Sequence, residues 1–488
     1  MIRDLDLLLI NVGGTKKKVY QDLSKDYSAI EPPFWAALTA GFIRNKDYRV
    51  DILDANAENL THDKTSKLIE VYNPKVTNIV AYGQHPSAST QLMSDIGILC
   101  KEIKKINPNR KVILTGLHPS ALPKKTMEEE VCDYVCQGEG FHTLLGLLED
   151  RKFNEIPGLW WKENSQTQNN QRAKNIENLD GELKDVAWDL LPMEKYRAHN
   201  WQCLNDLNSR QRYASISTSL GCPFTCSFCS INKTFGERKV RTWDSSLVVE
   251  QLEILSTKYN VRNVKIIDEM FILNPQHFMK IADEIIKKNL DLNIWAYARV
   301  DTVKEEYLDK LKKAGFNWLC FGFEAGNEKV RQDISKGNFN KKDMFKIRKI
   351  VGNSGINILG NYMFGLPEDN IDSMRETLNL AKELNCEFAN FYCTTAYPGS
   401  KLYDDAVDNG IKLPEKWADY AQHSKNFLPL PTKYLSAKEV LRFRDDAFDE
   451  YFKNPKYLQM IKDKFGEDAK KHIDEMTKIK LKRRLLED

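Results

Sequence analysis

Several features that would place a protein in a special class are missing from this sequence. The 488 residues contain no apolar run near the length of a membrane span, and Met1-Ile-Arg-Asp does not begin the apolar core of a signal peptide. The net charge of +3 is too small to indicate nucleic-acid binding. Ten cysteines in so long a chain are too few for a secreted disulfide framework. We therefore expect a cytoplasmic protein with no membrane span and no nucleic-acid partner.

The composition is that of an ordinary globular protein with more than one domain. Apolar residues make up 42% of the chain and charged residues 29%, and the length exceeds what one hydrophobic core usually supports. Changes in periodicity along the chain divide it into four parts: residues 1–150, a linker at 151–210, a second large domain at 211–400 and a helical C-terminal segment at 401–488.

Three cysteines form the most distinctive motif. Cys222, Cys226 and Cys229 lie in the run Gly-Cys-Pro-Phe-Thr-Cys-Ser-Phe-Cys, directly after a strand-like stretch at 213–220. A closed iron–sulfur cube normally takes four cysteines, so three from one loop leave one iron open, as in catalytic metal sites. Zinc is the alternative, but it favours paired Cys-x-x-Cys units or histidines, and the next cysteine is Cys320. The spacing favours an open 4Fe-4S cluster.

Strands and helices alternate through the first domain. Strands are expected at 5–10, 48–53, 78–82, 111–114 and 134–136, and helices at 34–43, 64–72, 91–106, 125–130 and from 139 onward. This alternation indicates parallel βαβ units. Five units predict an α/β fold with a flavodoxin-like (Rossmann-like) doubly wound parallel sheet, whose ligands bind beyond the carboxyl ends of the strands.

The loops at those strand ends are rich in glycine and small polar residues. They read Asn11-Val12-Gly13-Gly14, Tyr82-Gly83-Gln84-His85-Pro86-Ser87, Thr115-Gly116-Leu117-His118-Pro119-Ser120 and Gln137-Gly138-Glu139-Gly140. Glycine lets the backbone approach a large flat ligand, and serine or threonine can hydrogen-bond its polar edge. Each loop alone is also compatible with an ordinary turn, so the prediction of a ligand site depends on the set.

The same alternation returns after the cysteine loop. Further strands are expected at 263–267, 292–297, 318–323, 356–362 and 387–393, with helices at 247–258, 275–288, 306–314, 341–354 and 371–383. With the strand at 213–220 this makes six βα units. Beyond them, helices are expected at 436–452 and from 457 to the end. Tyr420 and His423 are candidate substrate contacts, with packing against the second domain as the alternative.

Both large domains resemble parts of one enzyme family. The six units from about 212 to 397, with the cysteine loop after the first strand, resemble the partial (β/α)6 barrel of radical S-adenosylmethionine (SAM) enzymes. The first domain, with Gly-x-His-Pro-Ser after its fourth strand, Gly-Glu-Gly after its fifth and Glu31-Pro32-Pro33 opening its first helix, resembles the cobalamin-binding domain of the cobalamin-dependent members. The Asp-x-His-x-x-Gly motif that supplies histidine to cobalt elsewhere is absent, so we do not expect His85 or His118 to bind the metal.

The resemblance implies sites for three cofactors. The three cysteines would hold the 4Fe-4S cluster. Residues at the ends of the barrel strands would contact SAM: Phe228, Asp268, Glu269, Arg299, Glu324 and Gly365. Residues in the strand-end loops of the first domain would contact cobalamin: Asn11, Gly13, Ser87, Thr115, Gly116, His118, Gly138, Glu139 and Gly140. Ion pairs or helix caps are the alternative roles for the SAM-site residues, such as Arg299 with Asp301 or Glu324.

The activity that the resemblance implies is methyl transfer. A 5′-deoxyadenosyl radical made from SAM would activate an unactivated carbon, or phosphorus, to receive the methyl group of methylcobalamin. The substrate would be a small molecule or natural-product precursor, and flavodoxin or ferredoxin would donate electrons. Two alternatives stay open: non-methylating radical oxidation or rearrangement on the same scaffold, and a corrinoid- or redox-sensing binding protein. An RNA methylthiotransferase fits less well, because extra cluster cysteines and a basic RNA-binding module are not evident.

Overall fold

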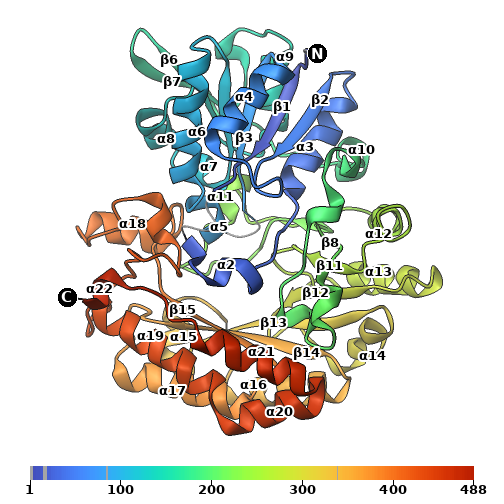
Figure 1. The fold of residues 1–488 in the computed structure, drawn as a ribbon, viewed down its shortest axis with the longest axis vertical. Coiled ribbons are helices and arrows are strands. Elements are labelled where there is room, and N and C mark those ends of the chain that lie inside the picture. Colours follow the sequence, from blue (N-terminus) through green and yellow to red (C-terminus); the bar gives the residue numbers. More distant parts are fainter. Residues whose placement is uncertain (1–3, 15–18, 84–85, 338, 488) are drawn as a thin grey trace.

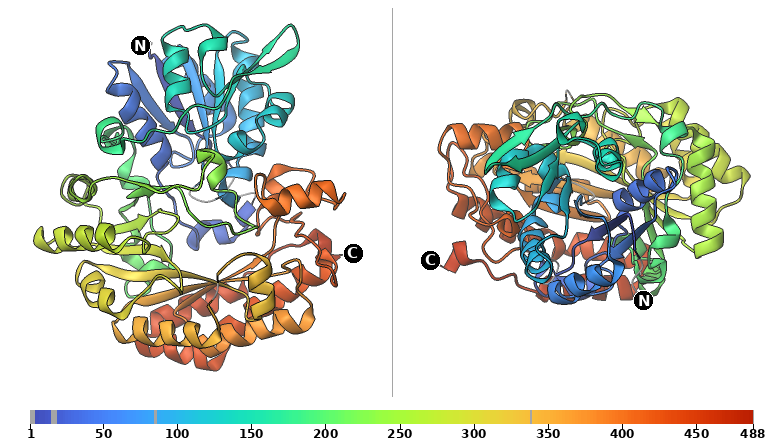
Figure 2. Two further views of the ribbon diagram at one scale, coloured as in Figure 1. Left: turned by 180° about the vertical axis from the view of Figure 1, so that it is seen from behind. Right: turned by 90° about the horizontal axis from the view of Figure 1, so that it is seen from above.

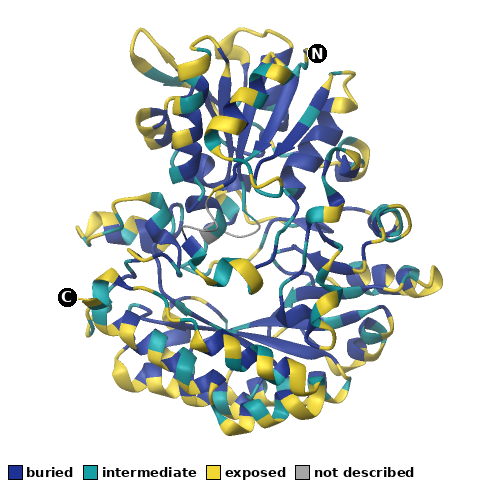
Figure 3. Ribbon diagram, in the orientation of Figure 1, coloured by how far each residue is buried: buried dark blue, intermediate teal, exposed yellow. Residues whose placement is uncertain are grey.

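Two largely parallel β-sheets carry the fold. The computed structural model describes residues 4–14, 19–83, 86–337 and 339–487, and for Pro86 and Ser87 it describes the backbone alone. One sheet has seven strands and the other six. Figures 1 and 2 show the seven-stranded sheet at one end of the molecule and the six-stranded sheet at the other, with the short helix α2 (Leu23–Asp26) between them. Both sheets are largely buried (Figure 3).

The first sheet confirms the predicted flavodoxin-like topology. Its five parallel strands are β1 (Leu7–Asn11), β2 (Val50–Asp54), β3 (Val76–Ala81), β4 (Val112–Gly116) and β5 (Tyr134–Cys136), in the order β2-β1-β3-β4-β5. Consecutive residues of β1 enter different cores, because strand side chains alternate between the two faces. Leu7 and Leu9 join the core that contains helix α3, whereas Leu8 and Ile10 join the core beneath helix α6.

Helices cover both faces of this sheet, as a doubly wound fold requires. The helices around it are α3 (Phe34–Arg44), α4 (His62–Tyr72), α5 (Pro86–Thr90), α6 (Met93–Ile106), α7 (Leu117–Ala121), α8 (Pro123–Glu129) and α9 (Phe141–Leu148). Residues 34–43 of α3 are all buried. That helix packs against the sheet on one side and against the irregular segment after residue 182 on the other, where Gly41 lies against the carbonyl of Asp185.

The beginning of the predicted linker adds two strands to the first sheet. β6 (Leu159–Glu163) pairs antiparallel with β5, and β7 (Gln166–Asn169) pairs antiparallel with β6. Asn164 and Ser165 connect them with φ of 49° and 64°, the backbone of a two-residue hairpin turn, and this turn is exposed. The sequence does not predict these strands, because Lys162, Glu163 and the glutamines give no clear apolar alternation.

The second sheet confirms the six predicted βα units. Its parallel strands are β8 (Tyr213–Ile216), β11 (Asn263–Ile266), β12 (Asn293–Ala298), β13 (Phe316–Glu324), β14 (Asn357–Phe364) and β15 (Phe388–Cys393), paired in chain order. The helices between them are α12 (Ser245–Tyr259), α13 (Pro275–Lys287), α14 (Glu305–Lys313), α15 (Glu328–Asp333), α16 (Lys341–Asn353) and α17 (Ile371–Leu384). β8 and β15 do not pair with each other, so the barrel is open along one side.

A small ribbon and four-residue helix shape the mouth of the barrel. β9 (Ser219–Leu220) pairs antiparallel with β10 (Arg241–Thr242), and Arg241 lies opposite Leu220. The cysteine motif lies between them, followed by α11 (Asn232–Phe235). The ribbon therefore holds both ends of the segment that carries the cysteines.

The C-terminal segment is helical, but one predicted helix is wrong. It contains α18 (Lys401–Asp408), α19 (Ala437–Phe452), α20 (Pro455–Phe465), α21 (Glu467–Lys478) and α22 (Arg484–Glu487). The single helix expected from 457 onward is broken at Gly466, whose φ of 91° is incompatible with a helix, and again after Lys478. Helix α19 packs against β14 and β15. In the described parts of the chain, no helix combines the length and apolarity of a membrane span.

Glu130, directly after α8, gives a prediction for stability against pH. Its side chain is buried against Gly97, and burial together with the charge of Glu129 raises its pKa to about 7. In the folded protein the Glu130 carboxyl keeps its proton at pH values above the pKa that it has in the unfolded chain. Its destabilising effect on the folded state therefore grows as pH rises from about 4.5 to 7 and is constant at higher pH. We expect Glu130→Gln to raise the free energy of unfolding by about 2 kcal/mol at pH 8 and to change it little at pH 4. Urea unfolding at both pH values, followed by circular dichroism, measures this. An equal effect at both would contradict it.

Candidate active site

The cysteine loop begins at the carboxyl end of the first barrel strand. Gly221 makes the turn with φ of 96°, and a Cβ there would lie 2.1 Å from the carbonyl oxygen of Lys239. The Asn232 side chain holds both backbone polar groups of Cys222: its Nδ2 donates to the carbonyl at 2.9 Å, and its Oδ1 accepts from the amide at 3.2 Å. The Cys229 amide donates to the carbonyl of Cys226 at 3.1 Å. The Asn232 side chain and the loop's own backbone contact thus shape the loop.

The chemistry of the loop suits an iron–sulfur cluster. Two of its hydroxyls, Ser227 Oγ and Ser230 Oγ, are buried without a hydrogen-bond partner among the described residues, so both are available to donate to cluster sulfur. In a 4Fe-4S cluster each cysteine binds a different iron. Within the described residues, no three His, Cys, Asp or Glu side chains lie close enough to hold a single metal ion. The loop would supply three thiols to the cluster irons and two hydroxyls to the cluster sulfurs.

The thiols of Cys222 and Cys229 are protonated when no metal is bound. Burial raises the pKa of Cys222 to about 11 and that of Cys229 to about 12, and the neighbouring Glu269 and Cys226 add to both shifts. Metal ligation requires thiolates, so cluster assembly must release these protons.

Asp268 and Glu269, the predicted SAM contacts after β11, have different surroundings. The buried Asp268 carboxylate accepts three hydrogen bonds of 2.6 Å, from the amide and hydroxyl of Thr218 and from the hydroxyl of Ser219. Asp268 therefore fixes the position of Thr218 and Ser219 at the start of β9. Glu269 makes no hydrogen bond to a described residue, and burial and Asp268 raise its pKa to about 8. Of the two, Glu269 is the carboxyl group with capacity left for a ligand.

The other polar residues predicted to contact SAM are paired within the protein. The Arg299 guanidinium makes two 2.9 Å hydrogen bonds to Asp301, which is the ion pair considered as its alternative role, and stacks 3.7 Å from the Phe224 ring centroid. Glu324 makes a 2.7 Å ion pair with Lys336.

The remaining two predicted SAM contacts, Gly365 and Phe228, lie at a turn and beside a cation. The Gly365 amide donates to Asp369 at 3.0 Å, at a φ of 79° that favours glycine. Lys336 Nζ lies 5.9 Å from the ring centroid of Phe228. Contacts of these residues with SAM stay predictions.

Lys336 is a site residue that the sequence did not reveal. Its side chain is buried, and Glu324 and Cys226 raise its pKa despite that burial. The adjoining Ser335 carbonyl lies 3.9 Å from Cys226 Sγ. The segment Ser335-Lys336-Gly337 carries no motif, and only the fold places it beside the cysteine loop.

Among the residues predicted to contact cobalamin, Asn11 is the last residue of β1, and Thr115 and Gly116 are the last two of β4. Asn11 donates to Asp54 at 2.9 Å, and Thr115 donates to Asn78 at 3.0 Å. A Cβ on Gly13 would lie 2.6 Å from the carbonyl oxygen of Ala55, and one on Gly116 would lie 2.4 Å from that of Ala81. Close approach of the backbone to its neighbours therefore accounts for both glycines without a ligand.

The loops after β4 and β5 are linked to each other. The Ser120 hydroxyl accepts from the Gly138 amide at 3.0 Å and donates to the Gly138 carbonyl at 3.2 Å. His118 is buried, with its ring edge-on to Trp417 and Nδ1 3.3 Å from Thr90 Oγ1, and burial lowers its pKa to about 3. It is a neutral histidine.

The last two predicted cobalamin contacts are Gly140 and Ser87. Gly140 has a φ of 97°, and a Cβ on it would meet no atom closer than Thr115 Cγ2 at 3.6 Å. Its backbone conformation, rather than crowding, therefore favours glycine there. The side chain of Ser87 lies outside the described residues.

Glu139 connects the first sheet to the barrel. Its carboxylate makes a 2.6 Å ion pair with Arg241 of β10 and accepts the Ile176 amide at 2.9 Å, and its carbonyl accepts Trp35 Nε1 at 3.2 Å. Both charged side chains are at most 5% exposed. This predicted cobalamin contact is thus fully occupied by protein partners, and its contact with cobalamin stays a prediction.

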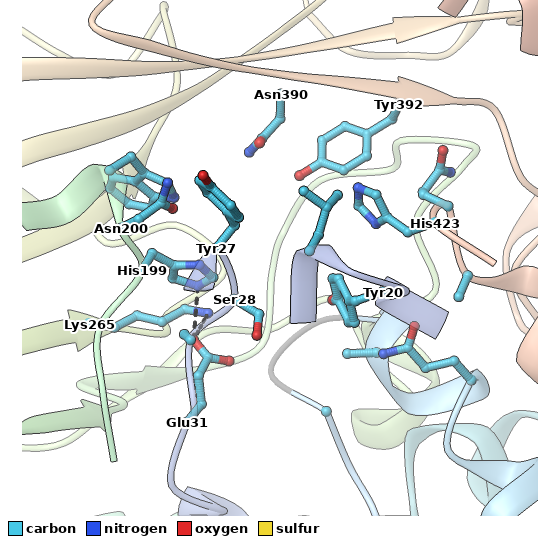
Figure 4. Close-up of a pocket in the computed structure, with 18 of the residues that line it drawn as sticks. Tyr20, Tyr27, Ser28, Glu31, His199, Asn200, Lys265, Asn390, Tyr392 and His423 are labelled. Atoms are coloured by element: carbon cyan, nitrogen blue, oxygen red, sulfur yellow. Dashed lines mark hydrogen bonds and ion pairs between the residues drawn. The ribbon is translucent and has the colours of Figure 1, made fainter. Parts of the chain in front are cut away.

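A cavity of about 330 Å³ lies between the two sheets and is lined by residues of both (Figure 4). Its lining combines Asn11 and Tyr82 from the strand ends of the first sheet with Tyr297 and Asn361 from the barrel, and His423 from the C-terminal segment. The lining thus includes His423, one of the two candidate substrate contacts.

Tyr82 separates this cavity from a second one of about 20 Å³ that Glu269 lines. The Tyr82 ring stacks on Trp35 at 4.7 Å and 9°. The larger cavity and the residues near the cysteines are therefore neighbours across one aromatic side chain.

A partly buried polar network lies on one wall of the cavity. Glu31 Oε1 accepts the Tyr213 hydroxyl at 3.0 Å and Lys265 Nζ at 3.1 Å, and lies 3.5 Å from His199 Nε2. Lys265 comes from β11, whereas Glu31 precedes α3. The Lys265 and His199 partners together hold the pKa of Glu31 below its ordinary value, against the effect of burial. The sequence pointed to the Glu31-Pro32-Pro33 motif but not to these partners.

Comparisons with known proteins identify the same two large domains. Residues 23–148 match the B12 binding domain family, and residues 216–381 match the Radical SAM superfamily. The chain belongs to the cobalamin-dependent radical SAM enzymes, as the sequence motifs predicted. Its cofactors are a 4Fe-4S cluster, SAM and cobalamin.

The relatives include enzymes named as methyltransferases. An uncharacterized methyltransferase of Pyrococcus horikoshii is 30% identical over 89% of this chain and 90% of its own length. The cytidylyl-2-hydroxyethylphosphonate methyltransferase of Streptomyces wedmorensis is 22% identical over 79% of each chain. Among solved structures, the radical SAM methyltransferase TsrM of Kitasatospora setae, with cobalamin and a [4Fe-4S] cluster bound, has a TM-score of 0.65 at 17% identity, covering 85% of this chain and 76% of that one. At 17% identity, the likeness to TsrM shows a shared fold only.

Proposed function

We propose that this protein is a radical SAM methyltransferase that places a methyl group on an unactivated carbon, or phosphorus, of a small molecule. The observation that carries the proposal is a cavity of about 330 Å³ lined by strand-end residues of the first sheet and by barrel residues, with the cysteine loop following the first barrel strand. Because the cysteine loop and the strand-end loops of the first sheet lie at the carboxyl ends of parallel strands, each sheet offers its ligand-binding edge to the other. The relatives named as methyltransferases support the same conclusion.

The parts of the chain take distinct roles in this proposal. Residues 1–150 hold cobalamin, residues 151–210 connect the domains, residues 211–400 hold the cluster and SAM, and residues 401–488 close the side of the barrel. When bound, the cluster with SAM supplies a radical, and cobalamin supplies a methyl group. The protein binds and orients the cofactors and excludes water from them. The three cysteines hold the cluster, Glu269 offers a carboxyl group near it, and Tyr82 stands between that carboxyl and the larger cavity.

The electron donor and compartment follow from the same chemistry. None of the ten cysteines forms a disulfide bond, which suits a reducing compartment. We place the protein in the cytoplasm, with flavodoxin or ferredoxin as the electron donor.

Non-methylating radical chemistry is the second candidate function. An anaerobic magnesium-protoporphyrin IX monomethyl ester cyclase of Rubrivivax gelatinosus is 25% identical over 77% of this chain. Its name describes a ring closure rather than a methylation, so the scaffold alone does not decide between the two reactions.

Cofactor loading tests the proposal first. Anaerobic reconstitution with iron and sulfide, followed by hydroxocobalamin and desalting, should give about four irons and one corrinoid per chain, with both visible in the ultraviolet–visible spectrum. Iron without corrinoid would leave a radical enzyme but remove the proposed methyl donor. Zinc in place of iron would contradict the whole assignment.

A further inference from the structure

Two sets of residues line the large cavity. The first belongs to the strand ends of the first sheet, among them Asn11 and Tyr82, which the proposed function assigns to cobalamin. Figure 4 shows Tyr392 and His423 on the side of the cavity away from Glu31. They belong to the second set, here called the β15 wall, which comes from the last barrel strand and the C-terminal segment: Asn390, Tyr392, Gln422, His423 and Arg444.

Arg444 brings a positive charge to the β15 wall that its counter-ion does not balance. Its Nη1 donates to Asp445 at 2.8 Å. The same carboxylate accepts two hydrogen bonds from Arg483, at 2.9 and 3.0 Å. Among the described residues, Asp445 is the only carboxylate within ion-pair distance of either guanidinium. Two buried cations therefore share one anion.

The other charged groups of the lining balance each other. Among the described residues that line the cavity, the charged side chains besides Arg444 are Glu31 and Lys265. These two form the 3.1 Å ion pair of the polar network. Burial lowers the pKa of the adjoining His199, so this ring adds no charge near neutral pH. The surplus charge of the lining is therefore the positive charge at Arg444.

The histidine of the β15 wall is affected by the same surplus. Burial lowers the pKa of His423 to about 3, and the two guanidiniums of Arg444 and Arg483 each lower it by more than Asp445 raises it. The neutral His423 ring stacks on Tyr20 with 5.2 Å between the ring centroids. The surroundings of His423 therefore carry a net positive charge that the histidine itself does not add to.

Arg444 also has hydrogen-bonding capacity left. Its Nε donates to the Phe391 carbonyl at 2.8 Å and its Nη1 to Asp445, whereas its Nη2 donates to no described residue. The Tyr392 hydroxyl likewise has no hydrogen bond to a described residue, and burial raises its pKa, so it stays a donor. The β15 wall thus offers a guanidinium and a hydroxyl, donors that suit carboxylate or phosphate oxygens.

From this geometry, and resting on the proposed function, we propose that the substrate carries an anionic oxygen group, a carboxylate or a phosphate, which binds Arg444 and Tyr392 on the β15 wall. Two buried guanidiniums that share one carboxylate lack a counter-charge, and a buried charge without a partner is unfavourable. An anion placed against Arg444 supplies that counter-charge and accepts charge-assisted hydrogen bonds. The nearby lining rings, Tyr20, Phe388 and Phe448, offer apolar surface to the rest of the molecule.

A matched pair of probes tests the charge preference. The protein is loaded with cluster and cobalamin and saturated with S-adenosylhomocysteine, and anaerobic calorimetry measures binding of 1-naphthaleneacetate and 1-naphthaleneacetamide. The two probes share a ring and differ in charge. We expect the acetate to bind roughly tenfold more tightly, the effect of a hydrogen bond to a charged group. Equal binding, tighter binding of the acetamide, or no saturable binding of either would overturn the inference.

Variants of the β15 wall locate the preference. Arg444→Met should bring the ratio of the two affinities to about one, because Arg483 and Asp445 then balance each other. Arg444→Lys keeps the charge and should keep most of the preference. Tyr392→Phe should weaken the acetate roughly threefold. An Arg444→Met protein with an undiminished preference would overturn the assignment, and if that variant fails to fold, Tyr392→Phe and the wild-type ranking decide.

The double variant Glu31→Gln/Lys265→Met is the matched control on the other side of the cavity. It removes one charge of each sign, so the preference for the acetate should stay within roughly twofold of that of the wild type. If this control lost the preference while Arg444→Met kept it, the anion would bind at Lys265 and the inference would be wrong.

Corrinoid binding identifies which ligand supplies the anion. Cobalamin is a second source of the same chemistry, because its tail contains a phosphodiester that cobinamide lacks. If the anion belongs to the substrate, Arg444→Met should bind both hydroxocobalamin and cobinamide as the wild type does. If Arg444→Met lost affinity for hydroxocobalamin and not for cobinamide, the cationic site would belong to the cobalamin tail, which would overturn the assignment to the substrate.

Failure of this inference is distinguishable from failure of the proposed function. Probe binding needs no turnover, whereas methyl transfer is read from the products of SAM. A protein that transfers methyl groups but prefers the naphthaleneacetamide would contradict only the substrate class.

Discussion

Cys226→Ala should retain no more than residual iron after reconstitution and should lose SAM cleavage altogether. A cluster with two protein ligands in place of three lacks a thiolate for one of its irons, and Cys226 is the middle cysteine of the loop. Anaerobic iron and sulfide analysis, with chromatographic measurement of 5′-deoxyadenosine, gives both readouts.

Cys132→Ala is the matched control for this variant. Cys132 is a free, buried thiol outside the cysteine loop, so its loss should leave about four irons per chain and normal 5′-deoxyadenosine formation. If Cys226→Ala kept its iron and its activity, the cysteine loop would not be the cluster site.

Arg241→Met should lower the free energy of unfolding by about 3–5 kcal/mol, because it leaves a buried carboxylate without its partner. Arg241 and Glu139 are 2.6 Å apart and nearly inaccessible to water. Arg241 also lies opposite Leu220, directly before the cysteine loop. We therefore expect this variant to retain less iron as well. Urea unfolding followed by circular dichroism, together with iron analysis, measures both effects.

The double variant Glu139→Gln/Arg241→Met separates charge from packing. With both charges removed, most of the lost stability should return, because an uncharged pair of similar size no longer requires a counter-charge. A single variant as stable as the wild type, or a double variant less stable than the single, would show that the ion pair does not hold the two domains together.

Local patterns were sufficient to predict the two sheets. The apolar run at Leu7–Ile10 and the regular alternation of strands and helices specify parallel βαβ units, whose strand order follows known rules. Prediction failed where the pattern was weak. The hairpin of β6 and β7 has mostly polar residues, and the final helix is interrupted at Gly466.

The candidate site was predictable only where its residues are close in sequence. The three cysteines lie within eight positions, so their spacing carries the chemistry by itself. Glu139 and Arg241 are 102 residues apart, and Glu31 and Lys265 are 234 apart. Such partners are brought together by the fold, and one sequence without relatives carries no signal that pairs them.

The fate of the methyl group of SAM tests the central claim most directly. The cofactor-loaded protein, reduced and supplied with SAM carrying a deuterated methyl group, should form S-adenosylhomocysteine and transfer the label to the corrinoid, as mass spectrometry of the extracted cofactor would show. Omitting cobalamin should stop formation of S-adenosylhomocysteine and leave formation of 5′-deoxyadenosine. If 5′-deoxyadenosine formed while the corrinoid stayed unlabelled and no S-adenosylhomocysteine appeared, the protein would be a radical enzyme of the non-methylating kind.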